Sequence, residues 1–113
     1  MVYTGTHDND TNIGWQKTSK KSDIKFARQY LGCPRGTLNN ALIISAMASV
    51  SDTAIITMQD ILELDSSARM NIPSTVGNNW SWRAKETDLN EKSFEILKYY
   101  TNIYCRMRKE DRK

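Results

Sequence analysis

The sequence predicts an α/β protein in which two short parallel strands alternate with helices. Two runs, at residues 2–6 and 53–58, have the β-prone composition of strands, and both lead into polar side chains. The second run is short, β-branched and continuously apolar, as expected for a buried parallel strand. Helical patterns follow each run, so the predicted order is βαβα with right-handed parallel crossovers.

The first predicted strand, over residues 2–6, is followed by a polar loop over 7–20 and then by a helix. Ser22 or Asp23 can cap the start of this helix, because either side chain can accept a hydrogen bond from a free backbone N–H. Its apolar positions recur at helical spacing: Ile24, Ala27 and Leu31. Gly32 is predicted to end the helix, since glycine readily adopts the left-handed backbone found there.

A second helix is predicted over residues 38–50, with Thr37 as its cap. Apolar side chains surround it nearly completely: Leu38, Ala41, Leu42, Ile44, Met47, Ala48 and Val50. A helix that is apolar on all sides needs neighbours on more than one side.

The second predicted strand, over 53–58, leads into a long polar segment over 59–87, predicted to be a loop. A loop of that length is usually functional or disordered. The last helix is predicted over 88–109, because Asp88 and Glu91 have the spacing of a capping box. Its apolar stripe comprises Ile96, Tyr100, Ile103 and Met107, widened by Leu97 and Tyr104.

The chain has 113 residues, 39% of them apolar, which suits one small domain with a modest core. Its sequence contains no apolar run long enough to span a membrane and no signal-peptide pattern, so a cytoplasmic protein is expected. Cys33 and Cys105 belong to no CxxC pattern, and thiols in a reducing compartment are expected.

The net charge of +3 comes entirely from residues 106–113, which carry five basic and two acidic side chains. A nucleic-acid-binding protein would instead spread its basic residues along a face, with aromatic residues between them. We therefore interpret residues 106–113 as the solvated end of the last helix, where cations suit the helix dipole. No nucleic-acid partner is expected.

The first candidate site is the polar cluster His-Asp-Asn-Asp at residues 7–10, which follows the first strand. Its two acidic residues and Asn12 have the spacing of calcium-loop ligands, but Ile13 replaces the required glycine and Ser19 the bidentate glutamate. The cluster also holds the only histidine, which excludes a multi-histidine metal site within one chain, and no metal is expected. The cluster is either a functional group at a strand end or a turn, which Asp and Asn also favour.

A second candidate site lies in the segment after the second strand, where asparagines and arginines surround two tryptophans. Its residues are Arg69, Asn71, Pro73, Asn79, Trp80, Trp82 and Arg83. An indole face can stack on a pyranose ring while amides and guanidinium groups bond the sugar hydroxyls. Packing of this segment onto its own scaffold is an equal competitor. Because parallel strands end at one edge of a sheet, both candidates are expected to form a shared site.

Two sequence blocks carry a family resemblance. The first is YTGTHDNDT at 3–11, followed by Gly14-Trp15. The second comprises MQDIL at 58–62, ARMNIP at 68–73 and GNNWSWR at 77–83. In their content, order and separation these blocks closely resemble the amylomaltases, bacterial 4-alpha-glucanotransferases related to the plant disproportionating enzymes. The resemblance covers nearly the whole chain.

The resemblance implies a (β/α)8 TIM barrel of the alpha-amylase clan, with residues 1–113 as a single partial domain, its C-terminal quarter. The two predicted strands would be the seventh and eighth of the barrel. The implied activity is retaining transfer of α-1,4-glucan segments between maltooligosaccharides, which needs a nucleophilic and an acid/base carboxylate. The clan supplies these from the fourth and fifth strands, which this chain lacks, so the chain alone is expected to be inactive. No cofactor is implied.

The resemblance also implies roles for individual residues. Asp8 matches the clan's third carboxylate, which holds sugar hydroxyls and stabilises a positively charged transition state. His7 matches a sugar-contacting histidine. The matched residues of the last loop border the substrate groove: Asn71, Pro73, Asn79 and Trp80. The family commonly has glycine at two turn positions where this chain has Ser74 and Asp65.

The alternative interpretation is a non-catalytic carbohydrate-binding or interaction module. In either case, two strands taken from an eight-stranded barrel leave open parallel edges, which invite pairing with another chain. The isolated chain is therefore expected to form homo-oligomers or to repack.

Overall fold

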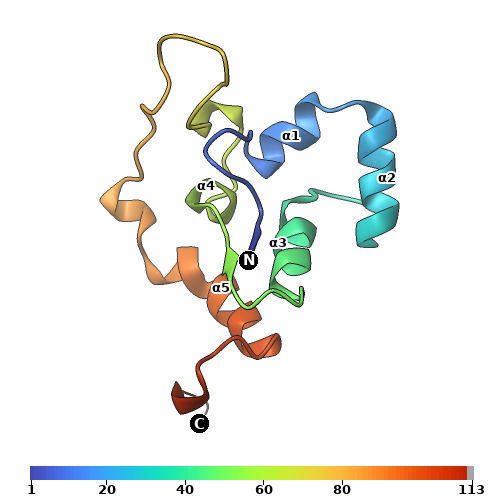
Figure 1. Ribbon diagram of the computed structural model, residues 1–113, viewed down its shortest axis with the longest axis vertical. Coiled ribbons are helices and arrows are strands. Elements are labelled where there is room, and N and C mark those ends of the chain that lie inside the picture. Colours follow the sequence, from blue (N-terminus) through green and yellow to red (C-terminus); the bar gives the residue numbers. More distant parts are fainter. Residues whose placement is uncertain (112–113) are drawn as a thin grey trace.

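The computed structural model describes residues 1–111 and is rich in helix, with one small parallel sheet (Figure 1). Strand β1 (Val2–Tyr3) pairs with β2 (Ala54–Ile55), so that Val2 lies opposite Ala54 and Tyr3 opposite Ile55. The described helices are α1 (Asn12–Thr18), α2 (Lys21–Leu31), α3 (Asn39–Met47), α4 (Met58–Ile61) and α5 (Glu91–Ile103). Short 3-10 turns cover Ser66–Ala68, Glu86–Asp88 and Lys109–Asp111. The α/β class and the parallel pairing are thus confirmed.

Both strands are shorter than the predicted ranges 2–6 and 53–58. The hydrogen bonding extends slightly beyond the paired residues, since Thr4 N donates to Ile55 O at 3.2 Å. The second strand ends early because the Thr57 hydroxyl accepts a bond from Asp60 N at 3.3 Å and so caps α4. The last residues of the predicted strand 53–58 therefore form the start of helix α4 instead.

Helix α1 lies inside the segment 7–20, where a loop was predicted, and that prediction is wrong. The Thr11 hydroxyl accepts a bond from Gly14 N at 3.0 Å and caps the helix. Gly14 is buried, and a Cβ atom there would lie only 2.6 Å from Cγ of Asp10. A glycine that looks like a loop signal in the sequence is instead needed for close packing inside a helix.

Helix α2 ends as predicted. Gly32 adopts a left-handed conformation with φ of 63°, and its N–H bonds to carbonyl oxygens of the last turn. The Arg28 guanidinium then secures the turn that follows, donating to Gly36 O at 2.8 Å and to Cys33 O at 3.2 Å. Neither predicted cap is used, because Lys20 occupies the N-cap position and contributes no side-chain bond.

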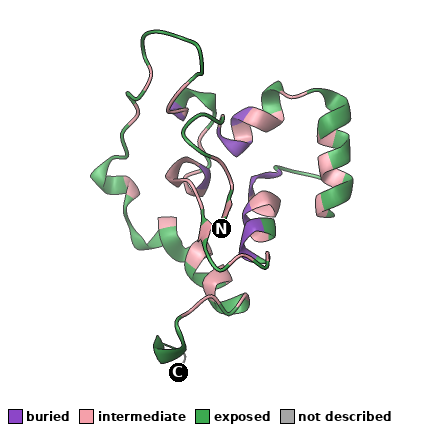
Figure 2. Cartoon of the chain, in the orientation of Figure 1, coloured by how far each residue is buried: buried purple, intermediate pink, exposed green. Residues whose placement is uncertain are grey.

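Helix α3 carries much of the core, and the predicted need for cover on several sides is confirmed. It packs against α1, α2, α5 and β2. Figure 2 shows buried residues concentrated on α3 and at the start of α1. The most buried apolar side chains are Leu38 and Ile43, at 0% and 1% exposure. The helix is shorter than the predicted 38–50, since it ends at Met47.

Arg106 closes the C-terminal end of α3, although it lies far away in the sequence. Its guanidinium donates to Met47 O at 2.6 Å, Ser51 O at 2.9 Å and Ser49 O at 3.0 Å. The interpretation of 106–113 as the solvated end of the last helix is therefore wrong: Arg106 caps α3, and residues 106–111 lie beyond α5, which ends at Ile103. Arg112 and Lys113 lie outside the described residues.

Helix α5 is shorter than the predicted 88–109. Asn90, not Asp88, is its N-cap, and the Asn90 side chain accepts a bond from Ser93 N at 3.1 Å. The predicted apolar stripe is only partly covered, because Ile103 is 56% exposed. The segment 59–87 is also not wholly a loop, since α4 and two 3-10 turns occupy part of it.

Candidate functional site

The two predicted candidate sites lie side by side, beyond the ends of β1 and β2. Asn71 N donates to His7 O at 3.1 Å, which links the loop after β1 to the long loop after α4. Residues more than 60 positions apart in the chain therefore share one surface. The predicted common edge is confirmed.

Asp8 is the centre of this surface. Its Oδ1 accepts a hydrogen bond from Asn71 Nδ2 at 2.7 Å, and its Oδ2 lies 3.4 Å from His7 Nε2. The side chains of His7 and Asp8 are 54% and 49% exposed. An oriented carboxylate that remains about half open to solvent can accept hydrogen bonds from the hydroxyls of a ligand.

Trp80 extends the surface as an aromatic wall. Its ring centroid lies 5.0 Å from that of His7, with an interplanar angle of 34°. The backbone of Trp80 is left-handed, with φ of 59°, which is rare for a bulky side chain. Trp80 N donates to Met70 O at 2.6 Å, which holds this conformation in place. Such strain is typical of functional sites.

Asn79 and Pro73 are placed differently from the other predicted site residues. The Asn79 side chain is used inside its own loop, accepting from Ile72 N at 3.0 Å and donating to Thr75 Oγ1 at 3.0 Å. Pro73 is exposed in the same loop. The structure therefore brings His7, Asp8, Asn71 and Trp80 together, whereas Asn79 supports the loop from within.

One of the two turn positions predicted from the missing glycines has glycine-like backbone. Ser74 has φ of 63°, a left-handed value that favours glycine. Near the other position the left-handed residue is Glu63, with φ of 55°, while Asp65 is extended with φ of −88°. The turn is thus real but lies two residues earlier than Asp65.

The arginines of the second candidate site bond to backbone rather than standing free for a ligand. Arg83 Nη1 donates to Trp80 O and to Trp82 O, both at 2.8 Å. Arg69 donates through Nη2 to Asp8 O at 2.7 Å and through Nε to Asn71 O at 2.9 Å. In this structure the guanidinium groups support the loops, and their expected use on sugar hydroxyls stays a prediction.

Beneath the site lies a buried polar network that the sequence did not reveal. Its centre is Asp60, which is 2% exposed. The carboxylate accepts from Thr57 Oγ1 at 2.7 Å, Asn12 N at 2.8 Å and Thr4 Oγ1 at 3.0 Å. Asn39 Nδ2 donates to the backbone oxygen of Asp60 at 2.8 Å. The Asp60 carboxylate thus ties the ends of both strands to the start of α1, and its backbone oxygen ties them to the start of α3. Its position directly after an apolar strand was the only available signal.

Asp10 has a supporting role as well. Its Oδ2 accepts from Ser66 Oγ at 2.7 Å and its Oδ1 from Thr11 N at 2.8 Å. The acidic side chains of the calcium-like spacing therefore bond to different partners. Within residues 1–111, no group of three or more His, Cys, Asp or Glu side chains could hold a metal ion.

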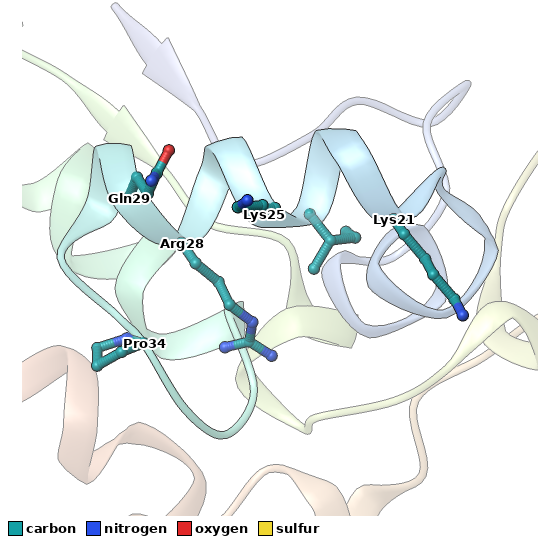
Figure 3. A pocket seen from close by; sticks show the side chains of 6 residues that line it. Lys21, Lys25, Arg28, Gln29 and Pro34 are labelled. Atoms are coloured by element: carbon teal, nitrogen blue, oxygen red, sulfur yellow. The ribbon is translucent and has the colours of Figure 1, made fainter.

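A cavity of about 240 Å3 opens beside the site, lined by Gly5, His7, Thr57, Gln59, Arg69 and Met70 among others. A separate hollow of about 410 Å3 lies on α2 and is lined by Lys21, Ile24, Lys25, Arg28, Gln29 and Pro34 (Figure 3). None of the predicted site residues lines the α2 hollow, so the surface around Asp8 remains the candidate site. None of the helices in the described part of the chain is long and apolar enough to cross a membrane.

Comparison with known proteins gives a consistent result. The sequence model of a family described as 4-alpha-glucanotransferase matches residues 1–89. The chain is 52% identical over 84 residues to the chloroplastic or amyloplastic 4-alpha-glucanotransferase of Oryza sativa subsp. japonica, covering 74% of this chain and 14% of that protein. It is 44% identical over 109 residues to the 4-alpha-glucanotransferase of Streptococcus pneumoniae, covering 95% of this chain and 22% of that protein.

A solved structure agrees. The chain superimposes on an amylomaltase from Streptococcus agalactiae in complex with acarbose, with a TM-score of 0.86 and 37% identity. The match covers 95% of this chain and 22% of that one. The chain therefore spans about a fifth of the length of the relatives that it matches over most of its own length.

Proposed function

The chain belongs to the 4-alpha-glucanotransferase family, and from that membership we propose that it forms part of the active-site edge of a glucan-transferring enzyme. In this proposal β1 and β2 are the last two strands of a (β/α)8 barrel. Their parallel pairing across a helical crossover supports this placement. Functional groups of such barrels lie beyond the carboxyl ends of the strands, which is where Asp8 lies here.

The observation that carries the proposal is the orientation of the Asp8 carboxylate beside His7 and Trp80. One oxygen is held by Asn71, while the other lies 3.4 Å from His7 Nε2 on a side chain that is 49% exposed. We propose that Asp8 bonds hydroxyls of the sugar at the cleavage point and stabilises an oxocarbenium-like transition state electrostatically. His7 and Trp80 would then provide the sugar-contacting wall.

The reaction itself would be retaining transfer of an α-1,4-glucan segment to another maltooligosaccharide. A retaining mechanism needs a nucleophile and an acid/base carboxylate about 5 Å apart. The family resemblance assigns both to strands outside this chain. We therefore propose that the 113-residue chain alone does not turn over maltooligosaccharides.

A segment exchange tests this proposal. In the enzyme from Streptococcus pneumoniae, the 109 aligned residues are replaced by those of this chain, and glucose release from maltotriose is measured. We expect the chimera to be active, and Asp8→Asn in it to lower turnover by about 10²–10³-fold, as for loss of one preorganised electrostatic group.

The exposed carboxylate of Asp52 provides the matched control, because Asp52→Asn should leave turnover unchanged within about twofold. Equal turnover for the Asp8→Asn chimera and its parent would refute the role of Asp8. Release of glucose and longer maltodextrins by the 113-residue chain alone would refute its inactivity.

A non-catalytic carbohydrate-binding module is the second candidate, and one observation favours it. Trp80 is 50% exposed and its ring packs against His7, which resembles a sugar-stacking surface that needs no further catalytic group. Saturable binding of maltotriose by the chain, lost in Trp80→Ala, combined with an inactive chimera would favour this candidate.

We further propose that the isolated chain self-associates. Large apolar side chains are exposed along α5, namely Phe94, Tyr99 and Ile103, and Ile55 is exposed on β2. Open parallel edges and exposed apolar surface both favour association. A monomer by sedimentation velocity would contradict this.

The place of the chain in the cell stays a prediction. A cytoplasmic location was expected from the sequence, whereas the rice relative is described as chloroplastic or amyloplastic. Fluorescent tagging of the full-length gene product would decide between them.

A further inference from the structure

Arg69 connects the two loops that form the site. Its guanidinium forks onto two backbone oxygens, with Nη2 on Asp8 O at 2.7 Å and Nε on Asn71 O at 2.9 Å. These two carbonyl groups belong to different loops, that of Asp8 to the loop after β1 and that of Asn71 to the long loop after α4. Arg69 itself is only partly exposed.

The bonds of Arg69 form a closed ring with those of Asn71. The Asn71 backbone is held by Arg69 at its oxygen and by His7 O at its N–H, at 3.1 Å. The side chain of the same Asn71 then donates to Asp8 Oδ1 at 2.7 Å. The direction of the Asn71 amide therefore depends on a backbone that Arg69 fixes at one end.

We propose that Arg69 is a positioning residue that sets the orientation of the Asp8 carboxylate through Asn71. In this arrangement Oδ1 is occupied by the Asn71 amide, and Oδ2 is presented on the side of His7 for a sugar hydroxyl. The geometry of this proposal stands on the hydrogen bonds of Arg69 and Asn71, whereas its consequence for sugar binding rests on the proposed function of Asp8.

The fork geometry is central to this role. A guanidinium presents several N–H groups in a rigid plane and can bond two fixed acceptors at once, whereas the ammonium of lysine is a single point charge. Arg28 is a natural control within the chain. It also forks onto two backbone oxygens, those of Cys33 and Gly36, but it lies on α2 (Figure 3) and bonds to neither loop of the site.

The experiment follows the side-chain amide resonance of Asn71 in 1H–15N spectra of the 113-residue chain. Asp8→Ala removes the acceptor and should move this resonance upfield toward that of a solvated amide. The same substitution is then made in three backgrounds: Arg69→Gln, Arg69→Lys and Arg28→Gln. Asn71→Ala identifies the resonance.

We expect the response to Asp8→Ala to fall to less than half in both Arg69 backgrounds and to stay full in Arg28→Gln. A purely structural role would not alter the coupling between Asn71 and Asp8 in a folded chain. A full response in either Arg69 background overturns the proposal. Unfolding of both Arg69 variants beside a folded Arg28→Gln chain also overturns it, because Arg69 would then be a general stability element.

Binding of maltotriose, measured by calorimetry on the same variants, separates this proposal from the proposed function. We expect Arg69→Gln and Asp8→Ala to weaken binding by a similar factor, at least fivefold, and Arg28→Gln to leave it within twofold. No binding by the unsubstituted chain would count against a sugar site in the chain, while the resonance result would still decide the role of Arg69.

Discussion

Arg106 Nε donates a hydrogen bond to the carbonyl oxygen of Met47 at 2.6 Å, across 59 positions of sequence. The last carbonyl groups of a helix have no partner within the helix, and here an arginine from beyond α5 provides one. A side chain that is distant in the sequence therefore provides hydrogen bonds to the C-terminal carbonyl groups of α3.

Removal of this cap should destabilise the chain. We expect Arg106→Ala to lower the free energy of unfolding by about 2–3 kcal/mol, because several charge-assisted hydrogen bonds are lost together. Urea unfolding followed by circular dichroism measures the effect. Arg108→Ala is the control, since the exposed Arg108 side chain forms an ion pair with the exposed Glu110 at 3.8 Å, and its loss should cost at most about 0.5 kcal/mol. Equal effects of the two substitutions would contradict the prediction.

The buried carboxylate of Asp60 should be similarly important. Asp60→Ala leaves two hydroxyl groups and the N–H of Asn12 without their acceptor, so we expect a loss of about 2–3 kcal/mol in unfolding free energy. Asp60→Asn keeps one acceptor oxygen and should lose less. The exposed Asp52, changed to alanine, should stay within about 0.5 kcal/mol of the parent. The three variants are compared by urea unfolding.

Gly14 and Gly5 form a matched pair for packing. A Cβ at Gly14 would lie 2.6 Å from Cγ of Asp10, whereas the nearest atom to one at Gly5 is Cβ of Asn9 at 3.5 Å. We expect Gly14→Ala to destabilise by about 1–3 kcal/mol through overpacking, and Gly5→Ala to have little effect. Thermal unfolding of both variants checks this, and a smaller loss for Gly14→Ala than for Gly5→Ala would refute it.

Ser74→Gly should stabilise the chain. Ser74 has φ of 63°, a conformation that costs a residue with a Cβ about 1–2 kcal/mol. Since glycine also gains freedom in the unfolded chain, the net gain should be about 0.5–1 kcal/mol. Ser74→Ala keeps the Cβ and serves as the control. A melting temperature that rises for Ser74→Ala as much as for Ser74→Gly would contradict this explanation.

Asp65 predicts a pH dependence on the acid side. Hydrogen bonds from the side chain and then the backbone N–H of Ser67, with a smaller contribution from Lys17, lower the pKa of the Asp65 carboxyl below its ordinary value of 3.8. A lowered pKa in the folded state means that the stabilisation is complete above 3.8 and is lost as the pH falls through the lower folded value. Asp65→Asn should therefore have a lower melting temperature than the parent at neutral pH, with the difference shrinking below about pH 4. A constant difference between the two at all pH values would argue against this.

Local signals in the sequence predicted the elements that depend on local physics. Gly32 ends α2 because the left-handed position needs no partner elsewhere in the fold. The parallel pairing of β1 and β2 followed from two β-prone runs separated by helical patterns. Helix α1 was missed because most of its sequence is polar; its cap, Thr11, and its close packing at Gly14 become visible only in three dimensions.

For the site, the sequence predicted which segments meet but not which side chains hold them in place. The common edge of parallel strands predicted that His7 and Asp8 lie near Asn71 and Trp80, and the contacts confirm it. The roles of Arg69 and Arg106 could not be predicted, because both side chains bond to backbone oxygens in distant segments. The identities of the residues in a sequence do not indicate which backbone carbonyl groups lie near an arginine in the folded chain.

The left-handed backbone of Trp80 sets two kinds of selection against each other. Glycine at this position would relieve the backbone strain, as at Ser74, but would remove the aromatic ring that packs against His7. Directed evolution of the chain for heat resistance alone would therefore favour loss of the ring, whereas selection for glucan transfer by the chimera with the Streptococcus pneumoniae enzyme, under the role proposed for this surface, would keep it. A library with all amino acids at position 80, divided between the two selections, would measure how much thermal stability the Trp80 side chain costs.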